Sequence, residues 1–247
     1  MSEKQIKIFP TVDELNQFAA IMFIHLSRQS IAESDRFTVS LSGGSTPKKL
    51  FQLLASDAVR PQIEWQKIHF FFGDERNVPI DSDESNYRMA NENLFSKLEI
   101  PARNIHRFLT EDGDAETIAK KMEDEIRDFF ELKSGEFPRF DLIFLGMGGD
   151  GHTASLFPET SALKEDKRII VENYVEKFET FRLTFTYPTI NNAKNIIFLI
   201  AGEDKAEALH EVLEGKANIT KFPSQGIAPS DGNLLFLVDA KAASKLN

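Results

Sequence analysis

Short, almost purely apolar segments recur along this chain, and each ends in glycine or in a serine–glycine turn. They are FTVSL, IHFFFG, FDLIFLG and NIIFLIAG, at residues 37–41, 68–73, 140–146 and 195–202. Amphipathic stretches with helical spacing lie between them. Strands that are apolar on both sides are typical of a parallel sheet with helices on both faces. The sequence therefore predicts an α/β fold in which these four segments are the central, buried strands.

The remaining segments predict further elements of the same fold. Thr11 and Glu14 have the spacing of a capping box, which predicts a helix from there to about Glu33. FRLTFTYP, at residues 181–188, predicts an antiparallel or edge strand, a small antiparallel addition in the C-terminal half. LLFLV, at 234–238, is expected to be the last strand. Because no repeat or long linker interrupts the chain, we expect one domain over residues 1–247.

Composition narrows the chemistry and the partners. The chain has no cysteine, which excludes disulfides, thiolate nucleophiles and cysteine metal sites. Its formal net charge of −10 argues against nucleic acid and anionic membrane surfaces as partners. No secretion signal and no apolar run of about 20 residues is present, so a cytoplasmic protein without a membrane partner is expected. A phosphorylated metabolite would have to be held by helix-start N–H groups and a few Lys or Arg side chains.

SGGSTP, at residues 42–47, follows the first of the buried strands. Thr46 suits a helix N-cap and Pro47 the first helical position, so the glycines would lie where backbone N–H groups point outward. The GxxxxGK[ST] pattern of nucleoside triphosphate sites is missing. The segment is therefore a candidate phosphate cradle, and a plain capped glycine turn is the alternative. Its candidate ligands are Ser42, Gly43, Gly44, Ser45 and Thr46.

DERNVP, at residues 74–79, follows the second buried strand. Asp74 and Arg76, an acid and a cation two residues apart, could hold sugar hydroxyls and an anion. A solvated turn with a local ion pair is the alternative. A second polar group, SNYR at 85–88, opens the next predicted helix.

The most informative segment is GMGGDGHTASLFP, at residues 146–158. Its glycines let the backbone approach a ligand closely, and His152 would stand at the rim as a general base near neutral pH. The alternative is a histidine that caps the next helix. The segment also fits GxGxxG, but Pro158 follows within a few residues and leaves no room for the long helix that a dinucleotide site requires.

A fourth loop, GEDKA at residues 202–206, starts another predicted helix. Lys205 would project from its first turn, where a lysine opposes the helix dipole, which suggests an anionic ligand; an exposed surface lysine is the alternative. The sequence has no GxSxG elbow, no HExxH motif and only five scattered histidines. Water is therefore the expected nucleophile, and no metal is expected.

Taken in order, SGGSTP, GDERNVP with SNYRMA, and GMGGDGHTASLFP resemble the 6-phosphogluconolactonases of the pentose phosphate pathway, and the similarity runs from residue 6 to about 239. The resemblance implies a Rossmann-like sheet, shared with glucosamine-6-phosphate deaminases and ribose-5-phosphate isomerases. It also implies a hydrolysis of 6-phospho-D-glucono-1,5-lactone that uses neither metal nor cofactor.

On this hypothesis His152 takes a proton from the attacking water, and Asp150 or Asp74 orients the imidazole or binds substrate hydroxyls. Arg76 would stabilise the developing negative charge. The expected phosphate ligands are Gly43, Gly44, Ser45, Thr46 and Lys205, with Arg182 as an additional candidate; Ser42, Gly148 and Gly149 complete the expected binding set. A monomer or a weak homodimer is expected.

Two other functions remain open from the sequence. Deaminases of the same superfamily carry a catalytic glutamate five residues after the histidine, where this chain has Phe157, so the departure favours a lactonase. A non-catalytic sugar-phosphate sensor is the second alternative. Such sensors carry a DNA-binding helix-turn-helix, for which we expect no room before the first strand.

Overall fold

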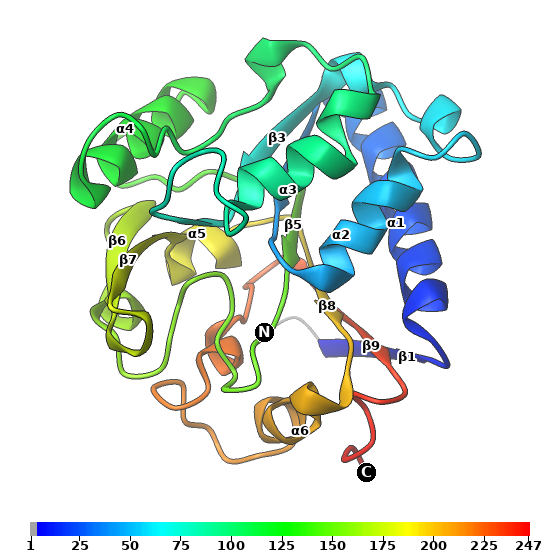
Figure 1. The fold of residues 1–247 in the computed structure, drawn as a ribbon, viewed down its shortest axis with the longest axis vertical. Helices are drawn as coiled ribbons and strands as arrows, with labels where there is room; N and C mark the ends of the chain where they lie inside the picture. The colour runs from blue at the N-terminus through cyan, green and yellow to red at the C-terminus, as the bar shows by residue number, and fades with distance from the viewer. Residues whose placement is uncertain (1–3) are drawn as a thin grey trace.

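The computed structural model describes residues 4–247, which form two sheets flanked by helices (Figure 1). The larger sheet has six strands in the order β1-β9-β8-β5-β2-β3, and every neighbouring pair is parallel. Its strands are β1 (Lys4–Phe9), β2 (Phe37–Leu41), β3 (Ile68–Phe72), β5 (Leu142–Leu145), β8 (Asn195–Ile200) and β9 (Asn233–Asp239). The predicted α/β fold with a mostly parallel sheet is confirmed.

One strand lies elsewhere than predicted. β3 was expected in the centre of the sheet, but it is an edge strand. It is buried all the same, because the segment after the 3₁₀ turn Ala102–Asn104 covers its free edge: Ile105 bridges to Phe70, and the His106 N–H donates to the Phe70 carbonyl at 2.8 Å. The apolar sequence of β3 therefore indicated that the strand is buried, and not that it lies in the centre of the sheet.

The helices are α1 (Val12–Ser34), α2 (Ser45–Leu54), α3 (Asn86–Asn93), α4 (Ala115–Phe129), α5 (Tyr187–Asn191) and α6 (Ala206–Leu213). α1 begins as predicted, because the Thr11 hydroxyl accepts the Glu14 N–H at 3.2 Å. In Figure 1, α1 and α2 lie on one side of β5 and β8, and α4 and α5 on the other. Over residues 4–247, no helix has the length and apolar character needed to cross a bilayer.

Short 3₁₀ turns complete the chain: η1 (Arg60–Gln62), η2 (Trp65–Lys67), η3 (Phe95–Lys97), η4 (Ala102–Asn104), η5 (Ser161–Lys164), η6 (Glu176–Phe178), η7 (Glu203–Lys205) and η8 (Pro223–Gly226). The core between α1 and the large sheet is rich in aromatic rings. Phe23 of α1 packs edge-on against Phe37 of β2 at 5.5 Å between ring centroids and lies parallel to Phe144 of β5 at 6.4 Å. These rings fix α1 over the middle of the sheet.

The smaller sheet is antiparallel, in the order β4-β7-β6. β6 (Ile170–Val175) and β7 (Thr180–Phe185) form the antiparallel addition predicted in the C-terminal half. β7 is the middle strand, so the edge position is wrong. The third strand, β4 (Asp74–Arg76), was expected to be a loop; it is three residues long, too short for an alternating pattern to appear in the sequence.

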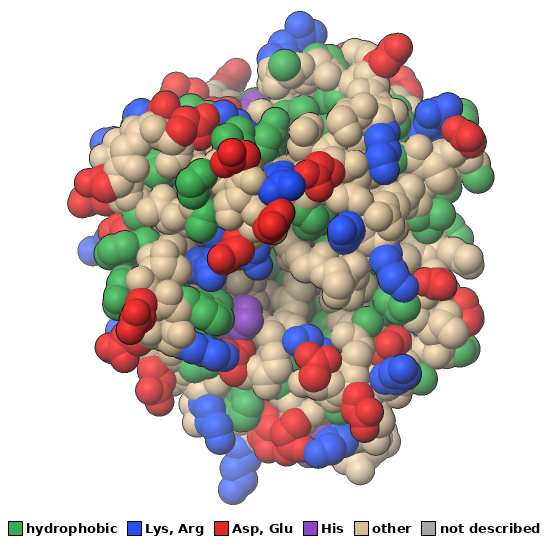
Figure 2. Space-filling model, viewed as in Figure 1, with side chains coloured by type: hydrophobic (Ala, Val, Ile, Leu, Met, Phe, Trp, Pro, Cys, Tyr) green, Lys and Arg blue, Asp and Glu red, His purple; other side chains and the backbone are tan. Residues whose placement is uncertain are grey.

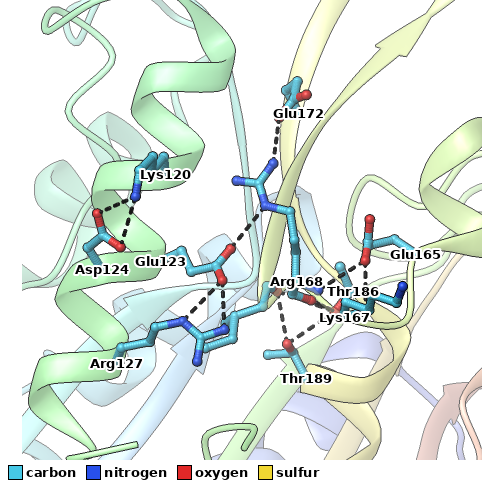
Figure 3. Close-up of polar contacts among 11 residues, drawn as sticks. Lys120, Glu123, Asp124, Arg127, Glu165, Lys167, Arg168, Glu172, Thr186 and Thr189 are labelled. Carbon is cyan, nitrogen blue, oxygen red and sulfur yellow. Dashed lines mark hydrogen bonds and ion pairs between the residues drawn. The ribbon is translucent and has the colours of Figure 1, made fainter. Parts of the chain in front are cut away.

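An ion cluster fastens this small sheet to α4 (Figure 3). Glu123 of α4 is buried and accepts from Arg127 of its own helix at 2.8 Å and from Arg168 at 3.2 Å. Arg168 also pairs with Glu172 of β6 at 3.4 Å. Because Arg168 lies just before β6, the cluster sets where the small sheet lies against the helix.

Candidate active site

A pocket of about 330 Å³ opens at the carboxyl ends of the parallel strands, beside the small sheet. Figure 2 shows the hollow, with Lys and Arg side chains gathered around it. This is where ligands bind in open α/β sheets. Its lining includes every residue predicted for the site apart from Gly149 and Asp150, namely Ser42, Gly43, Gly44, Ser45, Thr46, Asp74, Arg76, Gly148, His152, Arg182 and Lys205.

The first wall is the turn from β2 into α2. The helix starts earlier than predicted: its N-cap is Gly44, at φ +109°, and Ser45 rather than Pro47 is the first helical residue. Thr46 is thus inside the first turn and does not cap the helix. Glycine allows this because it has no Cβ, whose clashes make positive φ values unfavourable for other residues. The N–H groups of Ser45 and Thr46 have no partner within the helix, which is the arrangement that binds phosphate oxygens.

His152 is paired with Asp150. The ring Nδ1 lies 2.5 Å from Asp150 Oδ1, and the His152 backbone N–H donates to the same oxygen at 3.3 Å. Burial acts to raise the pKa of Asp150, but the hydrogen bond and the charge of the imidazole hold that pKa below its ordinary value. An ionised Asp150 accepts the Nδ1 proton, so Nε2 is left with a free lone pair. The pair has the geometry of an oriented general base.

Local structure excludes the alternative that His152 caps a helix. Residues 153–160 form turns and an isolated bridge, and no helix starts there. The glycine before the pair has a steric role: a Cβ on Gly148 would lie 2.1 Å from the imidazole Nδ1. Gly149 is outside the lining and backs onto the Asp204 carbonyl, 3.0 Å from where its Cβ would be.

Asp74 has different partners. Its Oδ2 accepts the Ser155 hydroxyl at 2.8 Å, and the Asn86 amide donates to its backbone carbonyl at 2.9 Å. Of the two acids proposed to orient the imidazole, the structure therefore places Asp150 against it, whereas Asp74 lines the pocket. Asn86 also lines the pocket but was not predicted; it belongs to the SNYR group, whose polar character was the available signal.

Glu75, between two predicted site residues, faces away from the pocket. It is 2% exposed and accepts the N–H groups of Asn86 and Tyr87 at the start of α3, both at 2.8 Å. Burial raises the pKa of this carboxyl, and the hydrogen bonds from the backbone act to lower it. Glu75 therefore fixes α3, and with it Asn86, relative to β4.

Two arginines lie opposite each other in the small sheet. Arg76 of β4 and Arg182 of β7 are register partners, and both line the pocket. Arg182 is 7% exposed, and its Nε and Nη1 have no hydrogen-bond partner. Its Nη2 lies 4.0 Å from Glu84 Oε2. Burial lowers the pKa of Arg182, and the charge of Arg76 lowers it further. The two like charges repel each other, so an anion bound between them would be stabilising.

Lys205 is the last residue of η7 and the N-cap of α6. Its side chain is 25% exposed, its Nζ lies 2.8 Å from Asp204 Oδ2, and it lines the pocket. Lys205 is therefore not an ordinary exposed surface lysine.

Aromatic rings form the remaining wall. Phe157 lies almost parallel to the His152 ring, with 4.1 Å between centroids, and Phe178 of η6 meets Phe157 edge-on at 5.7 Å. Phe178 was not predicted, because nothing in its local sequence distinguishes it from a core residue. Within residues 4–247, no three His, Asp or Glu side chains gather as metal ligands would.

Comparison with known proteins gives one consistent family. The sequence profile described as "Glucosamine-6-phosphate isomerases/6-phosphogluconolactonase" matches residues 10–236. A 6-phosphogluconolactonase of Nostoc sp. is 41% identical over 99% of both chains, and one of Synechocystis sp. is 44% identical over 88% of both. The structure of a 6-phosphogluconolactonase from Trypanosoma brucei superposes with a TM-score of 0.89 at 30% identity, covering all of both chains.

Proposed function

This chain belongs to the family of glucosamine-6-phosphate isomerases and 6-phosphogluconolactonases, and from that membership we propose that it hydrolyses 6-phospho-D-glucono-1,5-lactone to 6-phospho-D-gluconate. The observation that supports this reaction best is the His152–Asp150 pair beside a pocket that carries cations and free helix N–H groups. Such a pocket suits a substrate with a reactive carbonyl at one end and a phosphate at the other.

His152 is the general base of the proposed mechanism. Its Nε2 takes a proton from water as the water oxygen bonds to the lactone carbonyl carbon, and Asp150 stabilises the resulting imidazolium. The carbonyl oxygen becomes an oxyanion, and Arg76, which lines the pocket, is the residue that we propose to stabilise it. Collapse of the tetrahedral intermediate breaks the bond to the ring oxygen, which takes the proton from the imidazolium. The product is the open-chain acid.

The phosphate binds to the N–H groups at the start of α2 and to Lys205, in the proposed arrangement. Arg182 offers two unpaired donors to an anionic oxygen of the same ligand. Holding the far end of the substrate places the carbonyl next to His152, so the binding energy of the phosphate contributes to the rate.

Phe157 argues for a lactonase over a deaminase. A ring packed on the imidazole fills the position at which the deaminase pattern has a glutamate, so the second acid of that chemistry is missing. Ester hydrolysis by water requires one base and an oxyanion site, and we propose His152 and Arg76 for these two roles.

The test is a timed assay with freshly generated lactone, compared with its spontaneous hydrolysis. The wild type should accelerate the reaction, and His152→Ala should lose about 10²- to 10⁴-fold of that acceleration, because removing a general base typically has this effect. His25→Ala, a change of an exposed histidine, is the matched control and should keep full activity. Urea unfolding would check that the His152 variant remains folded.

Full turnover by His152→Ala would contradict the role of the base. Release of ammonia from glucosamine 6-phosphate, with no acceleration of lactone hydrolysis, would contradict the proposed reaction itself.

A further inference from the structure

The turn that joins β6 to β7 contacts the His152–Asp150 pair, although the pair belongs to a different loop, the one that follows β5. Lys177, in the middle of η6, places its Nζ 3.6 Å from Asp150 Oδ2. The other carboxylate oxygen, Oδ1, is the one that faces His152 Nδ1. Asp150 is thus held between an imidazole and an ammonium group, one on each oxygen.

The same turn is anchored to the pocket by Phe178. Its ring meets Phe157, which stacks on His152, and the Arg182 guanidinium lies 5.2 Å from the Phe178 centroid. Glu179 closes the turn in the left-handed region, at φ +50°, and Val175 pairs with Thr180 across the hairpin. These contacts fix the backbone of the turn, so the fold keeps Lys177 within reach of Asp150.

The charge of Asp150 has two opposite effects on a histidine base. It holds the useful tautomer, but it also favours the doubly protonated imidazole, which cannot accept a proton. A positive charge on the far oxygen offsets the second effect while it leaves the hydrogen bond in place. Lys177 is the cation that pairs with Asp150 there, and its charge adds to those effects that lower the pKa of Asp150. The other charged side chains that line the pocket with His152 are Asp74, Arg76, Arg182 and Lys205, and substitutions of Lys177 leave them unchanged.

We propose that Lys177 is a positioning residue for the His152–Asp150 pair: it orients the carboxylate and keeps the imidazole available as a base at lower pH. This inference rests on the proposed function only for its kinetic consequence. The electrostatic consequence concerns the protein without substrate.

The kinetic test follows kcat/KM between pH 5 and 7.5. Lys177→Met should move the acidic limb of the profile to higher pH by about 0.2 to 0.7 pH unit, the range that an exposed ion pair supports. Lys177→Arg should restore the wild-type limb. The shift should be smaller in 1 M than in 0.05 M salt, because Lys177 is solvent-exposed and the pair is screened. Lys97→Met, an equal charge change at an exposed lysine of η3, should leave the limb unmoved.

The second test needs no substrate. Five histidines give few imidazole Hε1 signals, and His152→Ala identifies the one of interest. The titration midpoint of that signal should rise in Lys177→Met by the same amount as the kinetic limb. In an Asp150→Asn background, Lys177→Met should shift the midpoint by less than it does in the wild type, because the carboxylate that pairs with the ammonium group is gone.

An unchanged midpoint in Lys177→Met, or an equal shift in Lys97→Met, would overturn the proposal. So would a fall in kcat/KM that is the same at every pH, since that is the effect of a merely structural residue. If the chain does not hydrolyse the lactone, the pH profile of kcat/KM cannot be measured, but the titration of His152 still can. A failure of the proposed reaction can therefore be told apart from a failure of the proposed role of Lys177.

Discussion

Arg182 is the residue whose chemistry is most clearly unsatisfied in the described structure. It is buried opposite Arg76 with two N–H donors unpaired, an arrangement that is unfavourable without an anion. Arg182→Met should therefore raise KM and lower kcat/KM by about 10- to 100-fold, the effect of one lost charge-assisted hydrogen bond. Its free energy of unfolding, measured in urea, should stay equal to wild type or increase. A variant that is less stable but fully active would contradict this account.

His69 belongs to a second group of titratable side chains, on the strand at the edge of the sheet. Its Nδ1 lies 3.1 Å from His106 Nε2, and His106 Nδ1 lies 2.6 Å from Glu125 Oε1. Burial lowers the pKa of His69 to about 4, and the charges of His106, Arg36 and Arg103 act in the same direction.

The consequence is a pH-dependent stability. Because the pKa of His69 is lower in the folded than in the unfolded chain, the unfolded chain binds more protons between about pH 4 and 6.5. The free energy of unfolding should be greatest above that window and should fall by about 1 to 2 kcal/mol as the pH drops through it, because His69 is only half-buried and solvent screens part of the effect. Urea unfolding at several pH values should show that the free energy of unfolding of His69→Gln depends less on pH than that of the wild type. His25→Gln, at an exposed position, should keep the pH dependence of the wild type.

The residues of the pocket that could be predicted from sequence are those that belong to a recognisable local pattern. The imidazole of His152, the serine–glycine turn and the DER segment all stand directly after strands, so the rule that such loops converge was enough to gather them in one pocket. Asn86 and Phe178 were missed, because they come to the pocket from α3 and from a hairpin turn. Their places depend on packing between elements distant in sequence, which no local spacing records.

At the scale of elements, the position of the small sheet depends on α4. Glu123→Gln should lower the free energy of unfolding by about 1 to 2 kcal/mol, because it removes the charge that pairs with two arginines at a buried position (Figure 3). Asp124→Asn is the matched control. It breaks only the exposed pair with Lys120 on the same helix and should cost less than about 0.5 kcal/mol. If the two variants lose the same free energy of unfolding in urea, the buried cluster contributes no more to stability than an exposed ion pair does.

Elements were predictable to the extent that their own sequence determines them. The Thr11 cap fixed the start of α1, and apolar runs located β2, β8 and β9. The start of α2 was misplaced by two residues, because Gly44 takes over a role that Thr46 could have filled. Likewise, β4 is a strand only because β7 pairs with it.

At the scale of the whole molecule, the pocket joins the two sheets. Loops of the parallel sheet supply residues 42–47 and His152, whereas the antiparallel sheet supplies Arg76 and Arg182. A ligand held by both should stabilise the fold by about 2.7 kcal/mol at 100 times its Kd. We expect 6-phosphogluconate to raise Tm, unphosphorylated gluconate to raise it less, and Arg182→Met to reduce the shift. Equal shifts for the two acids would argue against a phosphate site.

The close approach of Gly43 to Asn86 links the two ends of this pocket mechanically. A methyl group at position 43 would lie 1.9 Å from Asn86 Oδ1, the amide whose nitrogen holds the Asp74 carbonyl. Even alanine in the turn after β2 would push that amide aside and weaken its hydrogen bonds to the Asp74 carbonyl and, at 3.4 Å, to the Asp74 carboxylate. Attempts to re-engineer the anion-binding turn for a different headgroup would thus also disturb Asp74, unless positions 43 and 86 are varied together.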